Sequence, residues 1–274
     1  MNVALAIVTL IGSTAVAVAL MLLVRRHAPE GSYFADGDRA AGVFGVLATG
    51  FAVLVGFVVF LAFTSYDSAR AGAEDEARIV SQQVETVQLL PVAQSREMSG
   101  ELVCYARSVA GVQWTRMENH QLGDDLNPWS ERLFATLRQV NPQTPSEQAA
   151  YAKWLDERND RLDARNARIH GAEGVIPTPL WFVLFFASAV IVGYMLFFAD
   201  SGERAVTQAF MMGSVVALIA SMLLLLAFLN NPFHRGVGGL RPVAMERAIR
   251  VINQELSDAR VHVTPPCDAQ GNPR

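Results

Sequence analysis

The chain has 274 residues, which is enough for one large domain or two small ones. Its formal net charge of −4 provides no basic field, so we expect no nucleic-acid partner. Hydrophobic residues make up 51% of the chain and charged residues 18%. All the charges lie outside four apolar stretches of about twenty residues each, which excludes a single soluble core and predicts an integral membrane protein in contact with the lipid bilayer.

The four apolar stretches predict membrane spans at residues 2–24, 41–63, 180–199 and 208–229. A helix of about twenty residues crosses a hydrocarbon core of about 30 Å. The first stretch lacks the basic residues that open a secretory signal peptide, so we expect it to be retained. No span holds an Asp, Glu, Lys or Arg, which disfavours a pump with its own intramembrane carboxylate.

The spans divide the chain into four parts. We expect a first transmembrane hairpin at 1–63, a helical soluble domain at 64–179, a second hairpin at 180–229, and a C-terminal helix and tail at 230–274. The predicted fold class is all-α, with four transmembrane helices and the helical soluble domain inserted between helices two and three.

Apolar residues in the inserted domain recur at helical spacing. After the second span the chain is predicted to continue as a helical stalk that ends at Pro91, with a seam at Ala69, Ala73, Ala77, Val80, Val84 and Val87. A second helix is predicted near residues 94–119, with Met98, Leu102, Tyr105, Val109, Val112 and Met117 facing inward. Asn127-Pro128 opens a third helix, and Thr144 with Glu147 forms a capping box that opens a fourth, ending near Ile169.

The fourth of these helices is rich in charge, and we interpret its charges as a solvated face that includes an i,i+4 pair of Glu157 and Arg161. In the tail a seam recurs at Met245, Ile249, Ile252 and Leu256, which predicts a helix that docks on the helical domain or on a neighbouring subunit. After Val263 the chain is predicted to be disordered.

Sequence motifs for chemistry are absent. There is no P-loop, GxGxxG or HExxH motif, and the histidines are scattered, so we expect no metal site, no cofactor and no enzyme activity. Asp36 and Asp38 flank Gly37 just before the second span. They are typical of a turn and a helix N-cap, and the alternative is a ring of charges at the entrance of a pore in an oligomer.

Small residues recur in the second span at Gly42, Gly45, Thr49, Ala52 and Gly56, with spacings of three and four. This pattern places all five on one face of the helix. Small residues let helix backbones approach closely in lipid, so one interpretation is tight helix packing. The alternative is that the face lines a narrow pore around a symmetry axis, with Thr49 as its hydroxyl. A shorter face of this kind, with Gly213, Ala217 and Ser221, favours packing in the fourth span.

The side of the membrane is indicated by Arg25-Arg26-His27, which follow the first span directly. By the positive-inside rule this short loop is cytoplasmic, so the helical domain is predicted to be extracytoplasmic. Arg235, Arg241 and Arg247, which follow the fourth span, favour the alternative of a cytoplasmic domain. In an extracytoplasmic domain, Cys104 and Cys267 would share an oxidising compartment and could form a disulfide. The alternative is two unpaired thiols.

Several short strings, in order and spacing, are similar to the bacterial bestrophin-like membrane proteins of unknown function. They are Leu23-Val24-Arg25-Arg26, Asp38 with Gly42, Tyr66 with Ala69, Glu76-Ala77, Leu90-Pro91, Tyr105 with Val109 and Trp114, Pro177 with Leu180-Trp181, and Pro232-Phe233. The chain departs from the family pattern at Gly37, Gln113 and Asn230, where the family usually has Asn, Glu and Asp.

The resemblance implies an oligomeric membrane protein of the bacterial inner membrane, related to anion channels in which the second of four spans lines the pore. Those channels hold their helical segment in the cytoplasm, opposite to the orientation that the charges of this chain predict. We therefore expect a homo-oligomer, with two competing functions. One is an anion channel with the second span on the axis, and the other is a non-conducting scaffold, sensor or accessory subunit with a membrane protein partner.

Overall fold

A computed structural model describes residues 3–119, 121 and 127–274, and these residues form helices joined by loops. The chain divides into two compact units. The membrane unit comprises Met1–Ser65, Gly174–Asn231 and Arg235–Val237. The helical unit comprises Tyr66–Glu173, Pro232–His234 and Gly238–Arg274. One long helix, α2 (Gly37–Val87), contributes its first part to the membrane unit and its second part to the helical unit.

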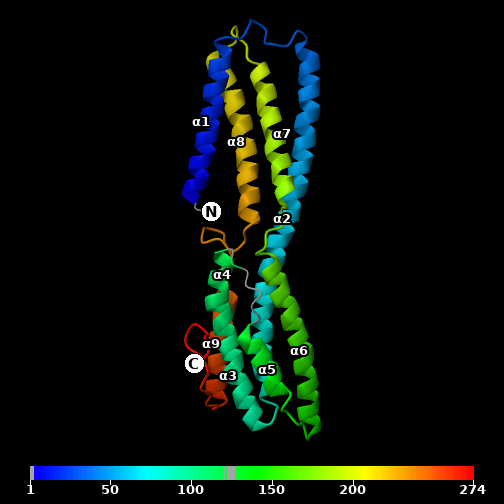
Figure 1. Cartoon of the computed structure of the whole chain (residues 1–274), viewed down its shortest axis with the longest axis vertical. Helices are drawn as coiled ribbons and strands as arrows, with labels where there is room; N and C mark the ends of the chain where they lie inside the picture. Colours follow the sequence, from blue (N-terminus) through cyan, green and yellow to red (C-terminus); the bar gives the residue numbers. More distant parts are fainter. Residues whose placement is uncertain (1–2, 120, 122–126) are drawn as a thin grey trace. The chain divides into compact units, whose positions relative to one another are not determined.

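The membrane unit contains α1 (Val3–Arg25), the first part of α2, α7 (Thr178–Phe197) and α8 (Ala205–Leu229) (Figure 1). All four helices are long and apolar enough to cross a membrane, and α1 contacts both α7 and α8. Large apolar side chains point outward, with exposed fractions of 66% for Val8, 73% for Phe182 and 80% for Val206. Such a surface is stable in lipid, where the surrounding chains are as apolar as the side chains. The predicted all-α membrane fold is therefore confirmed.

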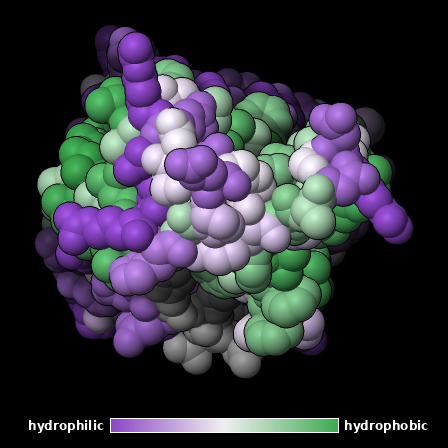
Figure 2. Space-filling view, turned by 90° about the horizontal axis from the view of Figure 1, so that it is seen from above, coloured by the Kyte–Doolittle hydropathy of each residue, from purple (hydrophilic) through white to green (hydrophobic). Residues whose placement is uncertain are grey.

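Two short loops meet at one end of the membrane unit. The Asp200 carboxylate accepts hydrogen bonds from the backbone N–H groups of Gly31, at 3.1 Å, and Gly202, at 2.7 Å. Gly31 has a φ of 84°, the left-handed conformation that glycine adopts without strain. Arg25 donates to the carbonyl of Ser201 at 3.0 Å, and the Phe34 ring stacks on Tyr194 at 5.3 Å. Hydrophilic residues cover this end, and hydrophobic residues flank it (Figure 2).

The helical unit contains the second part of α2 with α3 (Val92–Ser108), the π-helical turn η1 (Val109–Gln113), α4 (Trp114–Glu118), α5 (Pro128–Leu137), α6 (Pro145–His170) and α9 (Val243–Asp258). The α3, η1 and α4 elements follow one another directly and account for the helix predicted near 94–119. The Asn127 side chain accepts from the N–H of Trp129 at 3.1 Å, and the Thr144 capping box is formed. Both predicted helix starts are confirmed.

The core of the helical unit is built from the predicted seams. On α2, Ala69, Ala77, Val80, Val84 and Val87 are at most 3% exposed. On the next helices the seam positions Met98, Leu102, Tyr105, Val109 and Met117 are equally buried. The predicted seam positions Ala73 and Val112 are only half-buried. A residue buried on one side of an amphipathic helix stabilises the fold by about 1.5–3 kcal/mol when it is a Val, Leu or Met.

The C-terminal segment confirms the predicted helix and its docking on the helical domain, and differs from its prediction after Val263. Helix α9 packs on α3 of the same chain, so its apolar seam is covered within the subunit. The residues after Val263 are ordered, and the prediction of disorder there is wrong. The indole N–H of Trp129 donates to the carbonyl of Gly271 at 2.7 Å. Gly271 has a φ of 84°, and a Cβ at this position would lie 2.3 Å from the backbone nitrogen of Ser108. The chain end therefore lies directly on α3.

Candidate functional site

The small-residue stripe of α2 is formed by Gly42, Gly45, Thr49, Ala52 and Gly56, and all five are exposed. A Cβ atom added to any of the three glycines would meet no atom of the described chain within 4 Å. Gly213 of α8 behaves differently, because a Cβ there would lie 3.4 Å from Val18 of α1. The α8 glycine therefore packs against α1 inside the subunit, as predicted, whereas no described residue of the subunit covers the α2 stripe.

The remaining sides of α2 are occupied in other ways. Phe51, Val55, Val58 and Ala62 are buried and hold α2 in the membrane unit. At 100° per residue their mean direction lies about 130° around the helix from the stripe. Bulky side chains flank the stripe on its other edge, where Val46, Val53, Phe57 and Phe60 are 62% to 74% exposed. Lipid can cover these bulky apolar side chains, whereas the stripe has the small shape suited to a narrow axis or to another helix.

The two candidate entrance charges lie at the N-terminus of α2 and both are exposed. The Asp36 carboxylate accepts a hydrogen bond from the backbone N–H of Arg39 at 3.0 Å. Asp38 lies in the first turn of the helix, where a negative charge interacts favourably with the helix dipole. The cap geometry therefore accounts for Asp36, and the helix dipole accounts for Asp38.

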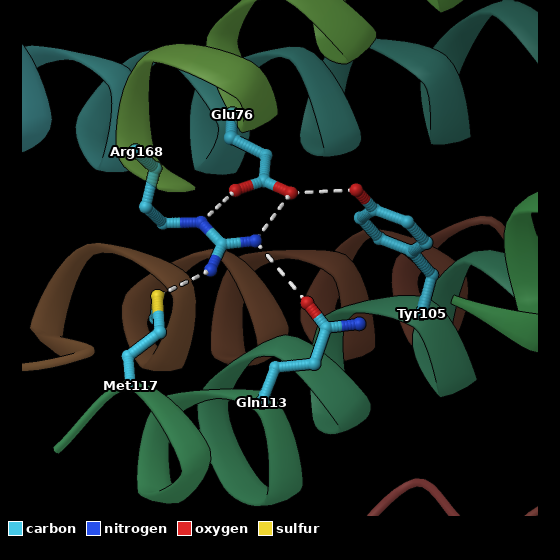
Figure 3. Close-up of polar contacts among 5 residues, drawn as sticks. All are labelled: Glu76, Tyr105, Gln113, Met117 and Arg168. Carbon is cyan, nitrogen blue, oxygen red and sulfur yellow. Dashed lines mark hydrogen bonds and ion pairs between the residues drawn. The ribbon is translucent and has the colours of Figure 1, made fainter. Parts of the chain in front are cut away.

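A buried polar network lies in the helical unit between α2, α3, η1, α4 and α6 (Figure 3). Arg168 donates from Nε to Glu76 Oε2 at 2.5 Å and from Nη2 to Glu76 Oε1 at 3.2 Å. The Tyr105 hydroxyl donates to Glu76 Oε1 at 2.5 Å. Arg168 also donates to the Gln113 side-chain oxygen at 3.2 Å and to the Met117 sulfur at 3.3 Å. The Arg168 and Glu76 side chains are 1% and 0% exposed, so this ion pair is fully desolvated.

A second buried arginine, Arg161, lies over the Tyr105 ring at 4.3 Å. Its guanidinium is fully buried, and none of its three nitrogens has a hydrogen-bond partner among the described residues. Burial lowers the pKa of Arg161, although Tyr105 and Glu76 favour its charged form. Burial and the Glu76 carboxylate raise the pKa of the Tyr105 phenol. Two arginines therefore share a single close carboxylate, and the network carries an excess positive charge.

The interpretation of the α6 charges as a solvated face is wrong for three residues, because Glu157, Arg161 and Arg168 are buried. Glu157 accepts from the Thr86 hydroxyl at 3.0 Å and lies 3.5 Å from Lys153, so its contacts do not include the expected one to Arg161. The spacing of these residues along α6 could have indicated that they are buried. The buried residues of α6 recur at three and four in the order Trp154, Glu157, Arg161, Ala164 and Arg168.

The structure joins Cys104 of α3 to Cys267 in the C-terminal tail by a disulfide, with a Cα–Cα distance of 5.7 Å. Both cysteines are fully buried. Arg107, one turn further along α3, donates to the carbonyl of Asp268 at 3.4 Å. In the described part of the chain, no group of three or more His, Cys, Asp and Glu side chains could hold a metal ion.

Comparison with known proteins gives a family and a fold. A family model described as the Bestrophin-like domain matches residues 11–244. A solved structure of a bacterial bestrophin homolog from Klebsiella pneumoniae is similar with a TM-score of 0.70 and 14% identity, covering 92% of this chain and 99% of that one. A mutant of a bestrophin homolog from the same organism has a TM-score of 0.68 and 13% identity, with the same coverage. No curated protein matches the chain.

Proposed function

The chain belongs to the Bestrophin-like family, and on this basis we propose that it is the subunit of an oligomeric anion channel in a bacterial inner membrane, with α2 on the axis. The exposed small-residue stripe of α2 carries this proposal. Five consecutive stripe positions over four turns offer no bulky side chain, and the protomer leaves them uncovered. Around a symmetry axis, such a stripe leaves room for a narrow path at which Thr49 supplies a hydroxyl. The choice of an anion rests on the family.

The experiment is an efflux measurement on proteoliposomes that contain the purified protein. We expect chloride efflux from the wild type and a loss of at least tenfold in Thr49→Leu and Gly45→Leu, because a leucine would occlude the axis. The matched control is Gly50→Leu. Gly50 lies on the same helix between two stripe positions and is exposed, but it points away from the stripe. A Cβ atom added at Gly50 would have no atom of the described chain within 4 Å. Equal losses in Gly50→Leu and Gly45→Leu would contradict the assignment of the pore to this face.

A non-conducting scaffold, sensor or accessory subunit is the second candidate, because a stripe of small residues also suits close packing against a helix of another membrane protein. The two candidates differ in what Gly45→Leu removes. A channel subunit would keep its oligomer and lose efflux. A scaffold would show no efflux in the wild type, and Gly45→Leu would release its oligomer or its membrane protein partner, as measured by light scattering in detergent.

We propose that the helical unit faces the extracytoplasmic side. Arg25 ends α1 and Arg26 begins the loop that joins α1 to α2, and these two charges favour a cytoplasmic location of that loop. A disulfide between Cys104 and Cys267 is stable in an oxidising compartment. Single cysteines added at the exposed positions Gln254 and Ser201 test this orientation in intact cells. A membrane-impermeant maleimide should label Gln254→Cys and spare Ser201→Cys, and the reverse pattern would place the helical unit in the cytoplasm.

A further inference from the structure

A groove of about 650 Å³ runs along the helical unit between α2 and α9. Its charged lining consists of Arg70 and Arg78 from α2, Arg241 and Arg247 from the α9 side, and one carboxylate, Glu74. We call it the arginine groove. Between the arginines the wall is apolar, with Ala77, Ala244 and Ala248. Val243 and Val251 also line it and are 48% and 41% exposed. An apolar wall with a charged rim is the composition of a surface that a partner covers.

The positive charge of the arginine groove is only partly neutralised within the subunit. Arg70 pairs with Glu74 at 3.0 Å, and Arg78 pairs with Asp75 at 3.2 Å, both in exposed i,i+4 or i,i+3 contacts. For Arg241 and Arg247 the described residues provide no carboxylate within ion-pair distance. Two exposed guanidinium groups on one wall therefore remain available to a carboxylate from outside the subunit.

A second groove of about 360 Å³ lies between α2 and α6 and has the opposite charge. Its carboxylates are Asp75, Asp160 and Asp163, and we call it the aspartate groove. Arg78 lines this groove as well as the arginine groove and pairs with Asp75, so Asp160 and Asp163 supply its excess negative charge. Asp156 continues the exposed acidic edge of α6 one turn further, since positions 156, 160 and 163 share one helix face. At 100° per residue, the α2 positions that line this groove lie about 140° around the helix from those that line the arginine groove. One subunit thus presents a basic and an acidic surface on different sides of the same helix.

We propose that the arginine groove receives the acidic edge of α6 from a second copy of the chain. The inference rests on the proposed homo-oligomer and names the surfaces that join its subunits. A contact between two different surfaces is heterologous, so every subunit uses both and successive copies continue around an axis until the ring closes. Arg241 and Arg247 meet Asp160 and Asp163 across the contact. The second copy also covers Val243 and Val251. Opposite charges on the two surfaces fix the direction and register of the contact.

Cysteine crosslinking tests the heterologous geometry. Arg247→Cys and Asp163→Cys are made singly, because both positions are exposed and the two native cysteines are bonded to each other. A short bis-maleimide should leave each single variant uncrosslinked. Co-expression of the two single variants should give covalent dimers, and a chain with both cysteines should give a ladder that ends at the size of the ring. Strong dimers from either single variant alone would show a symmetric contact and overturn the proposal.

Charge reversal provides the second test, and it separates this inference from the proposed function. Arg247→Asp should weaken association at least tenfold at low salt, and addition of Asp163→Arg should restore it, since the swapped pair is again complementary. Arg250→Asp is the matched control, because Arg250 is exposed on α9 but does not line the groove. A wild type that is monomeric by native mass spectrometry would refute the homo-oligomer itself. An oligomer that Arg247→Asp leaves intact, with no crosslinks between positions 247 and 163, would refute only the proposed contact.

Discussion

Replacement of Glu76 by glutamine is the sharpest test of the buried network. The substitution keeps the size and shape of the side chain and removes its charge. Glu76 accepts two hydrogen bonds from Arg168 and one from Tyr105, and its side chain is fully buried. In the variant, Arg168 and Arg161 remain buried without a close carboxylate, and one former acceptor atom becomes an amide N–H₂ that faces donors.

The expected magnitude follows from the burial of the pair. Removal of one partner from a desolvated ion pair costs about 3–5 kcal/mol, because the remaining charge is left uncompensated. The excess positive charge from Arg161 places Glu76→Gln toward the upper end of that range. For a unit of about 150 residues, each kcal/mol lowers Tm by roughly 2–4 °C, so we expect a fall of about 10 °C or more.

The assay is a thermal melt of the purified protein in detergent, followed by tryptophan fluorescence, because Trp114, Trp129 and Trp154 are all buried in the helical unit. The matched control is Glu74→Gln, two residues away on α2. Glu74 is paired with Arg70, but both side chains are about 60% exposed. An exposed pair contributes about 0–1 kcal/mol, so Glu74→Gln should shift Tm by no more than about 4 °C.

A second variant distinguishes loss of charge from loss of shape. Gln113→Glu, combined with Glu76→Gln, places a carboxylate near Arg168 again, because the Gln113 side-chain oxygen already lies 3.2 Å from Arg168. We expect this double variant to recover at least half of the lost stability. If Glu76→Gln behaves like Glu74→Gln, or if Gln113→Glu rescues nothing, then the network is not held together by charge and this reasoning is refuted.

Three further predictions concern the helical unit. Gly72→Ala should destabilise it by about 2–3 kcal/mol, because its Cβ would lie 2.7 Å from backbone atoms of Ala164 and Arg168, and a thermal melt beside Gly50→Ala checks this. Glu101→Gln should leave the free energy of unfolding unchanged near pH 4.5 and raise it by up to about 3 kcal/mol above pH 7. Burial raises the pKa of Glu101 to about 7, so ionisation of the wild-type carboxyl above that pH opposes folding; thermal melts of variant and wild type from pH 4.5 to 8 measure this effect. Cys104→Ser should lower stability by about 2–5 kcal/mol, since the disulfide closes a loop of 163 residues, and reductant should have the same effect on the wild type but none on the variant.

The helices of this chain could be predicted from the sequence because their signals are local. Charge-free runs located the four spans, and period-3.6 seams located the stalk and α9. The two helix starts at Asn127 and Thr144 depend on side chains within three residues of the bonds that they make. In each case the physical cause, which is lipid solvation, amphipathic burial or capping, acts over a few turns of chain.

The buried charges of α6 could not be predicted in this way, because their partners are distant in sequence. Arg168 is neutralised by Glu76, which lies 92 residues earlier, and Glu157 accepts a hydrogen bond from Thr86, which lies 71 residues earlier. From the sequence alone, a charged residue at a core-facing position is interpreted as solvent-exposed, because its distant partner cannot be identified. The ordered C-terminal end has the same explanation, since Cys267 and Gly271 depend on Cys104 and Trp129 in α3 and α5.

The π-helical turn η1 explains how residues on either side of it come to share one network. Tyr105 and Met117 are twelve residues apart, and in an uninterrupted α-helix they would point about 120° away from each other. A π turn absorbs one extra residue, which reduces the offset to about 20°. Both side chains then reach the same ion pair, Tyr105 through Glu76 and Met117 through Arg168. The predicted inward position Val112 lies in this turn and is only half-buried, and the next buried position after Val109 is Trp114. The π turn and the buried charges are therefore parts of one arrangement. The turn brings Tyr105 and Met117 to the same side of α3–η1–α4, and Glu76 of α2 and Arg168 of α6 bind them there.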